Sequence, residues 1–454
     1  DAGQFEDLLD GSYMSFGLSD SWCRGMTSDV SDGTNEVYYV LFQNDQGQKL
    51  YQYAYNPELP LKPEKELTVY TLYDQATINQ AATLFGKKHP DTMVSVHVAC
   101  TDMDDKEAET ERNRLMTSLA AGEGEDVLVL SGLDDNALAK KGVLMDLSDI
   151  VTPMEENGEL LQAIVDGEKA ADGKQQILPV RFALPLLLSK EKRASEMTDL
   201  AALAKAAEQT DGSLLGTFTG EDLVDTFAPY FMQDIITDKQ LDTEKLRTVL
   251  QELQTIAAHS DLIEKYKKGE RASNEWDLPS TMQAVLCQIS GFNDAMFDLA
   301  IINLVKGDYT SFENAYIPTV EIGVNANTKQ AELAKEFAAF VMSREVQDGD
   351  FYDGFPVNKE SLHMQVNLDR SNYAAYTTIE GADGQEIGLD IEQIKAADAD
   401  RLETICESLS QKTMQDAKVL EELKKAVPAY LLGRQSLDDT ISKIQDGVKI
   451  YLAE

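Results

Sequence analysis

Beyond an N-terminal segment, hydrophobic residues along the chain alternate between the spacing of strands and the spacing of helices. Residues 67–72 and 127–130 are short apolar runs, and the valines within 94–98 alternate with polar residues, as in strands. Between these runs, residues 78–85 place apolar side chains on one helical face, and residues 107–121 form a charged helical segment. The order strand, helix, strand, helix, strand predicts a parallel sheet with helices on both sides.

The alternation continues in the rest of the chain. A second block begins with a strand at residues 177–180 and predicts helices over 241–258 and 278–289. Residues 320–347 return to a strand followed by a helix, and residues 390–454 are predicted to be mostly helical.

The N-terminal segment has a different pattern. Residues 37–42 and 49–55 are strand-like and aromatic, and the turn formers of residues 43–48 separate them. This predicts a β-hairpin, which would be marginal alone in water. We therefore expect it to pack on the next part of the chain, or to be the remnant of a larger β domain. The prolines of residues 57–63 predict a stiff, extended linker.

Length and charge narrow the function classes. A chain of 454 residues suits two or three domains, and no apolar run reaches the roughly 18 residues that span a bilayer. The formal net charge of -40 argues against nucleic acid and against anionic lipid as partners. No basic, apolar leader stands at Asp1, so we expect any signal peptide to be absent from this sequence.

Motifs for metal, cofactor or covalent chemistry are not found. Cys23, Cys100, Cys287 and Cys406 lie far apart, which predicts buried free thiols and leaves one disulfide open. The four histidines form no HxxxH pair, and residues 102–105 lack the glycine and terminal glutamate of a calcium loop. There is no GxSxG, P-loop or GxGxxG motif. We predict no catalytic residue, no metal and no cofactor.

Short motifs recur in a fixed order along residues 64–454. They are residues 85–90, 119–127, 138–147, 177–182, 325–346, Gly354-Phe355-Pro356-Val357-Asn358-Lys359, 430–433 and 451–454. In this order they resemble the extracellular solute-binding proteins of ABC importers, the family that includes maltose-binding protein. Residues 292–298 keep the Ala-Met of the family but lack its glycine-rich continuation, and the chain has only two tryptophans. These departures leave the ligand class open.

The resemblance implies an α/β fold of the two-lobed, type II periplasmic-binding-protein kind, with a small N-terminal β-hairpin appendage. The implied parts are the appendage at 1–63, lobe 1 at 64–178 plus 317–352, and lobe 2 at 182–315 plus 355–454. The chain would cross between lobes near Pro179, Pro318 and Gly354, and Gly354 would serve as a hinge element.

The resemblance also implies a function. Such a protein would be a monomer that captures a small solute, most of all a carbohydrate, in an interlobe cleft and delivers it to an ABC importer permease. We expect it outside the cell, lipid-anchored at the surface, with no enzymatic activity. Two alternatives stay open: a secreted glycan-active enzyme, and the ligand-binding component of a sensor system.

Ligands of open α/β sheets lie beyond the carboxyl ends of the strands, so the loops there carry the candidate residues. These are Tyr73 and Asp74, then Ser131, Gly132, Leu133 and Asp134, then Arg181 and Phe182. Asp74 and the aspartates from Asp134 onward have an alternative role as helix caps. Arg181 has an alternative role as the partner of a neighbouring acid, because acidic residues outnumber basic ones two to one.

Four further candidates lie in the second half of the chain. Trp276 stands in a polar stretch and offers a stacking surface for a sugar ring, with core packing as the alternative. Asn293, Asp298 and Tyr316 lie near the second crossover and complete the predicted ligand-binding set.

Overall fold

The computed structural model describes residues 14–29, 37–44, 47–54, 63–101, 105–237, 239–381 and 383–453. The chain divides into two compact units, the first made of Asp1–Phe182 and Pro318–Leu368, the second of Ala183–Ile317 and Asp369–Glu454. The third passage between units follows Leu368, later than the predicted crossing at Gly354. The reason is that Phe355 and Pro356 pair with Phe182 and Arg181, which keeps this segment in the first unit.

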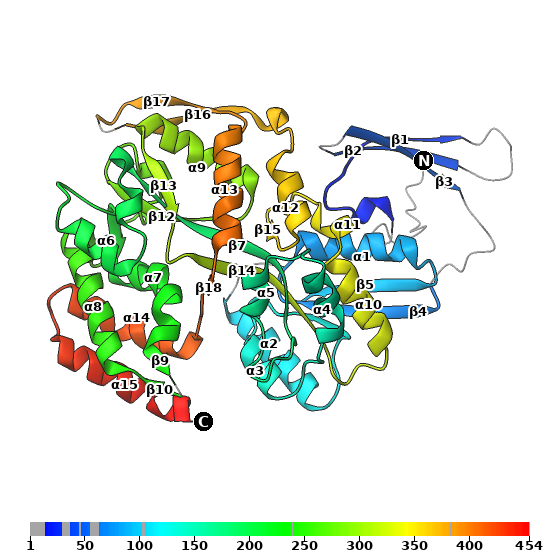
Figure 1. Cartoon of the computed structure of the whole chain (residues 1–454), viewed down its shortest axis with the longest axis horizontal. Helices are drawn as coiled ribbons and strands as arrows, with labels where there is room; N and C mark the ends of the chain where they lie inside the picture. The colour runs from blue at the N-terminus through cyan, green and yellow to red at the C-terminus, as the bar shows by residue number, and fades with distance from the viewer. Residues whose placement is uncertain are drawn as a thin grey trace. The chain divides into compact units, whose positions relative to one another are not determined.

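The first unit contains the predicted parallel sheet (Figure 1). Strand β4 (Lys65–Thr71) lies between β5 (Thr92–Val98) and β6 (Val127–Val129) and is parallel to both. Helix α1 (Ala76–Lys88) follows β4, and α2 (Asp105–Ala120) follows β5. Because the two crossovers run in opposite directions along the sheet, right-handedness places α1 and α2 on opposite faces.

Two cores support these helices. Tyr70, Leu72 and Leu128 of the sheet pack with Leu115 and Leu119 of α2 in one buried cluster. On α1, Phe85 lies with its ring centroid 5.4 Å from that of Phe337 in α10 (Ala331–Val341). The other elements of this unit are α3 (Asp135–Lys140), α4 (Ser148–Glu156), α5 (Gln162–Asp166), α11 (Arg344–Gln347), β15 (Phe355–Pro356) and α12 (Lys359–Val366).

The N-terminal hairpin is confirmed and is larger than predicted. Strands β2 (Val37–Asn44) and β3 (Gly47–Ala54) pair antiparallel, and β1 (Trp22–Asp29) adds a third strand beside β2. A short 3-10 helix, η2 (Ser15–Gly17), precedes them. The backbone N–H of Ser19 donates to Gln80 Oε1 in α1 at 2.9 Å, so the appendage packs on the first long helix after it in the chain. Residues 57–62 of the predicted linker lie outside the described residues.

The second unit contains strands, a helical bundle and a hairpin. Strand β7 (Leu178–Ser189) enters it from the first unit and pairs antiparallel with β12 (Ala284–Ile289) and β13 (Asp308–Ser311), while β14 (Ala315–Val324) leaves it after pairing with β18 (Gln411–Lys412). One buried core joins α6 (Leu200–Ala207), α7 (Gly220–Ile235), α8 (Thr243–Ala258), α14 (Ala417–Leu431) and α15 (Leu437–Ala453). Strands β16 (Ala375–Glu380) and β17 (Glu386–Ile391) pair antiparallel as a hairpin. The same unit also contains helices α9 (Phe292–Val305) and α13 (Ala396–Ser408).

Small elements complete this unit. They are η3 (Lys190–Lys192), η4 (Ala194–Glu196), β8 (Thr217–Thr219), β9 (Ile236–Thr237), β10 (Gln240–Leu241), β11 (Asp261–Ile263), η5 (Glu275–Asp277) and η6 (Ser371–Tyr373).

The helix predicted over residues 278–289 is wrong. Its apolar residues recur at helical spacing, but Ala284–Ile289 form strand β12 against residues 184–189 of β7. Pairing with the fully buried strand β7 outweighs the short helical period of this segment, because the backbone groups that face β7 gain hydrogen-bond partners in the ladder.

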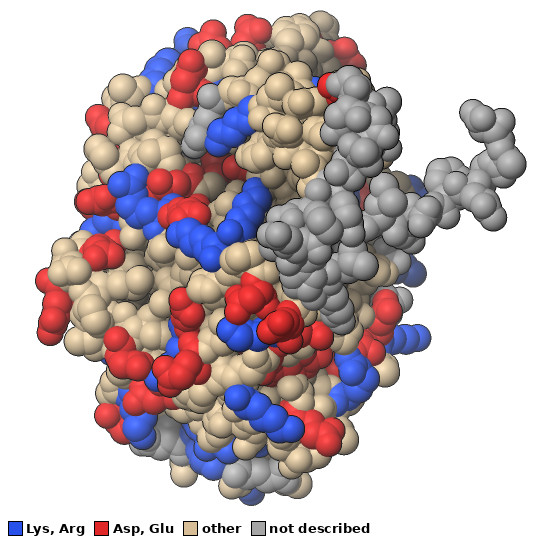
Figure 2. All heavy atoms as spheres, turned by 90° about the vertical axis from the view of Figure 1, so that its right-hand side faces the viewer, with Lys and Arg blue, Asp and Glu red and all other residues tan. Residues whose placement is uncertain are grey.

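The surface carries charges of both signs, although acidic residues outnumber basic ones two to one in the sequence. Figure 2 shows acidic and basic side chains interspersed over one face. Within the described residues, no helix combines the length and the apolar character that a bilayer crossing requires.

All four cysteines are free thiols, and Cys100 and Cys406 are buried as predicted. Cys23 is exposed, against the prediction, because it lies on β1, whose residues are all exposed.

Candidate functional site

The loops after β4 and β6 meet in the first unit, because these strands are parallel neighbours. A Cβ atom added to Gly132 would lie 3.0 Å from Leu72 Cδ2 and 3.8 Å from Tyr73 Cε2. Gly132 has a φ of +80°, which favours glycine, and its carbonyl accepts a hydrogen bond from Arg112 Nε at 2.7 Å. Tyr73 and Gly132, both predicted from the sequence, therefore lie side by side at the carboxyl edge of the sheet.

Hydrogen bonds to β14 and within the loop itself hold the rest of the loop after β6 in place. Ser131 Oγ donates to the Thr319 carbonyl at 2.7 Å, and the Leu133 N–H donates to the Leu130 carbonyl at 2.8 Å. The Asp134 carboxylate accepts from the Ala137 N–H at 2.9 Å and caps α3. The capping role that the sequence offered for Asp134 is thus the one that the geometry supports.

The side chain of Asp74 does not cap helix α1. It is exposed and accepts a hydrogen bond from Asn79 Nδ2 at 2.8 Å, while Gln75 occupies the N-cap position of α1. The carboxylate of Asp353 caps this helix instead, accepting from the Thr77 N–H at 2.7 Å and the Thr77 hydroxyl at 2.9 Å. Capping by Asp74 is therefore wrong, because a residue distant in sequence takes that role.

Arg181 is fully buried in the first unit. Its Nε donates to Thr77 Oγ1 at 3.0 Å, and its Nη2 donates to the carbonyls of Val346 at 3.3 Å and Gly349 at 3.0 Å. Burial lowers the pKa of Arg181, and the nearby charge of Asp353 opposes that shift. These contacts tie the start of α1 to the end of α11. They give Arg181 a structural role, through a hydroxyl and carbonyls rather than an acid partner, while its Nη1 is buried without a hydrogen-bond partner among the described residues. Contact of Arg181 with a solute stays a prediction.

Two neighbours of Arg181 are also packing residues. Phe182 is fully buried, with its ring centroid 5.8 Å from that of Phe355. Gly354 has a φ of +136°, and an added Cβ would lie 2.4 Å from Thr319 Oγ1 and 2.9 Å from Arg181 Cβ. Only glycine fits this position without movement of the backbone. Its role as a hinge stays a prediction.

In the second unit, an aromatic pair stands between η5 and α9. The rings of Trp276 and Phe297 are 6.4 Å apart and tilted by 53°. Phe297 is 40% exposed, and Trp276 is partly buried, so the pair offers an open apolar surface beside polar neighbours. The sequence pointed to Trp276 but not to Phe297, which needed the helix and η5 to be placed.

Beside this pair, the predicted residues Asn293 and Asp298 are buried on α9. Asn293 Oδ1 has no hydrogen-bond partner among the described residues. Burial raises the pKa of Asp298 well above its ordinary value, and the charges of Glu275 and Asp294 raise it further. Tyr316, the last predicted residue, is fully buried on β14 at a position paired with Lys412.

The raised pKa of Asp298 predicts a pH dependence of stability. An unfolded aspartate ionises near 3.8, whereas the buried carboxyl keeps its proton to a much higher pH. Between these values the unfolded state binds fewer protons, so stability falls as the pH rises through this window. We expect Asp298→Asn to melt higher than the wild type at pH 7, with the difference shrinking toward pH 3.8. The exposed Asp211→Asn is the control, and a neutral-pH melting temperature lowered only by Asp298→Asn would contradict the prediction.

The structure also gathers three carboxylates that the sequence did not single out. One oxygen each of Asp135, Glu168 and Glu321 lies within 4.8 Å of the others, and Glu168 and Glu321 are buried. Such a donor set could hold a cation, although none of the three residues is without other partners in the structure. Their distance in sequence hid the group, because only the packing of α3, the segment after α5 and β14 brings them together.

Comparisons with known proteins agree with this architecture. Residues 71–348 match the family described as bacterial extracellular solute-binding protein, and no curated protein matches the chain. A sugar transporter from Rhizobium etli superposes with a TM-score of 0.57 at 14% identity, covering 85% of this chain and 99% of the other. An ABC substrate-binding protein from Listeria monocytogenes in complex with cycloalternan gives 0.55 at 14% identity, covering 86% and 99%.

A third solved structure is an ABC transporter solute-binding protein from Thermotoga lettingae bound with alpha-D-tagatose. It gives a TM-score of 0.52 at 15% identity and covers 86% of this chain and 100% of the other. At such identities the likeness establishes the fold alone. The predicted α/β, periplasmic-binding-protein-like fold class is confirmed.

Proposed function

The chain belongs to the bacterial extracellular solute-binding proteins, and from that membership we propose that it captures a small carbohydrate for the permease of an ABC importer. The observation that carries the sugar assignment is the open pair of Trp276 and Phe297. The C–H faces of sugar rings stack on aromatic rings, while their hydroxyls bond to polar groups around the stack. Two of the similar structures hold cycloalternan and alpha-D-tagatose, which supports the same class of ligand here.

We assign distinct roles to the residues that would contact the sugar. In the second unit, Trp276 and Phe297 form the stacking surface, and Asn293 Oδ1 accepts a hydrogen bond from a sugar hydroxyl. A buried acceptor without a partner costs free energy, so a hydroxyl that reaches it would contribute to affinity. In the first unit, considered by itself, Tyr73 and the exposed carboxylate of Asp74 are candidates for hydrogen bonds to a solute.

A panel of mono- and oligosaccharides, amino acids, peptides and polyamines tests this function. A captured sugar should raise the melting temperature, with a linkage free energy of about 3 kcal/mol at a hundredfold excess over its dissociation constant. Isothermal titration then measures the affinity and a stoichiometry of one. A folded protein that responds to no sugar in the panel would overturn the carbohydrate assignment. Slow consumption of a bound glycan would instead favour the glycan-active enzyme.

A further inference from the structure

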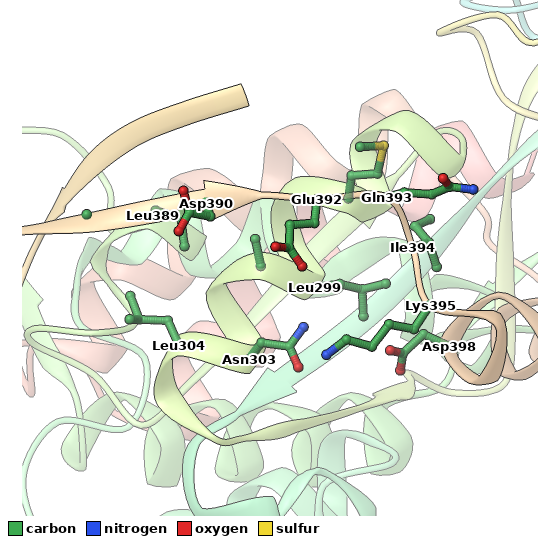
Figure 3. Close-up of a pocket in the computed structure, with 13 residues that line it drawn as sticks. Leu299, Asn303, Leu304, Leu389, Asp390, Glu392, Gln393, Ile394, Lys395 and Asp398 are labelled. Atoms are coloured by element: carbon green, nitrogen blue, oxygen red, sulfur yellow. The ribbon is translucent and has the colours of Figure 1, made fainter. Parts of the chain in front are cut away.

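A cavity of about 320 Å³ lies within the second unit, and none of the residues that line it is among those predicted to bind the solute. It is formed by the C-terminal half of α9, the end of β17, the connection over residues 392–395 and the first turn of α13 (Figure 3). None of its lining residues is aromatic, so it offers no stacking surface for a sugar ring.

The floor of the cavity is apolar. Met296, Leu299 and Leu389 line it and are buried. Contact with these side chains would remove an aliphatic group of a ligand from water, which favours binding. The volume lies at the lower end of the ligand pockets of proteins, about 300–1,000 Å³, and suits a molecule of amino-acid or dipeptide size.

The rim carries charges of both signs that are kept apart. Asp390, Glu392 and Lys395 line the cavity and are exposed, and within the described chain no hydrogen bond or ion pair engages their side chains. By contrast, Asp398 on the same rim accepts a hydrogen bond from the Tyr309 hydroxyl at 3.3 Å. In Figure 3 the Glu392 carboxylate and the Lys395 amine lie on either side of Leu299. An ammonium group and a carboxylate of one small molecule could therefore each meet an opposite charge across the apolar floor.

We propose that this cavity binds a small zwitterion with an aliphatic body, the chemistry shared by free amino acids and short peptides. Its ammonium group bonds to Asp390 and Glu392, its carboxylate bonds to Lys395, and its alkyl group rests on Met296 and Leu299. This site shares no lining residue with the proposed sugar site, and its occupancy is measured in the absence of sugar.

Leucine, leucinamide and isocaproate test the proposal, because they share the same branched alkyl group and differ in charge. Leucine carries both charges, leucinamide lacks the carboxylate, and isocaproate lacks the ammonium. We expect leucine to bind about tenfold tighter than either, since each analogue loses one set of charged hydrogen bonds. Calorimetry measures the affinity, and the methyl resonance of Met296 in methionine-labelled protein reports occupancy of the cavity itself.

Two substitutions assign the charges. Glu392→Gln should weaken leucine and reduce its advantage over isocaproate, whereas Lys395→Gln should reduce its advantage over leucinamide. Glu386→Gln removes the same charge at the start of β17, outside the cavity, and should leave all three affinities unchanged. Alanyl-leucine separates the two sources: tighter binding than leucine assigns the cavity to peptides, and weaker binding assigns it to free amino acids.

Two results would overturn the proposal. One is that leucine and alanyl-leucine, at concentrations up to about 10 mM, give neither binding heat nor a shift of the Met296 methyl resonance. That concentration exceeds the dissociation constant of a specific site with millimolar affinity. The other is an equal affinity for leucine, leucinamide and isocaproate in the wild type.

Discussion

Trp276→Ala is expected to lose most of the affinity for the sugar that the wild type binds, while the protein stays folded. The ring is only partly buried and lies tilted beside the exposed Phe297, so its loss removes a contact surface rather than the centre of a core. Truncation of an anchoring tryptophan costs about 2–4 kcal/mol of binding free energy, which corresponds to at least roughly thirtyfold in dissociation constant. Isothermal titration with the sugar identified from the panel measures the loss, and Trp276→Phe should retain part of the affinity.

The second tryptophan provides the control. Trp22 is 50% exposed on β1 of the N-terminal sheet, so Trp22→Ala removes the same side chain elsewhere. It should leave the sugar affinity unchanged. If Trp276→Ala binds sugar as tightly as Trp22→Ala does but melts much lower, the core-packing role of Trp276 is correct and the stacking role is wrong.

Arg181→Ala is expected to destabilise the first unit severely and to bind sugar normally wherever it is folded. The guanidinium is fully buried and donates to Thr77 and to the carbonyls of Val346 and Gly349. Its loss leaves these acceptors without their donor and leaves Asp353 without a neighbouring positive charge. Breaking a buried charged network in this way costs about 3–5 kcal/mol of unfolding free energy. Chemical denaturation followed by a probe in the first unit measures the change.

Variants on either side of this change sharpen the test. Arg181→Lys keeps the charge but not the fork of donors, so its stability should be intermediate. Arg434→Ala removes an exposed arginine that bonds to Glu264 at 2.8 Å, and it should cost far less because water replaces the partner. Loss of sugar affinity by Arg181→Ala without loss of stability would restore the ligand-binding role that the sequence offered for this residue.

Local patterns predicted much of the secondary structure. The apolar face predicted at residues 78–85 lies in α1, and the predominantly helical character predicted for residues 390–454 is seen in α14 and α15, because these helices are periodic over several turns. Strands β1, β16 and β17 were not predicted. They are exposed along most of their length, so their sequences do not need the alternation of apolar and polar residues that marks a half-buried strand.

The candidate site divides in the same way. Asp134 caps a helix that begins at the next residue, so its partner could be inferred from the sequence. The cap of α1 could not, because Asp353 reaches Thr77 across most of the first unit's sequence. The same holds for Arg181, which the sequence offered as a residue that contacts the ligand, whereas β15 pairs with it and the end of α11 accepts its hydrogen bond.

The sequence by itself determined the family, and it predicted the strands and helices of residues 65–130 and the loops between them, because these depend on spacing within short segments. Only the tertiary structure decided which of those loop residues are open and which are buried. It paired Trp276 with Phe297, enclosed Arg181, and left the charges around the cavity of the second unit apart. Burial and hydrogen bonding depend on neighbours far away in the chain. The spacing of residues within a short segment does not identify the distant segment that will pack on it.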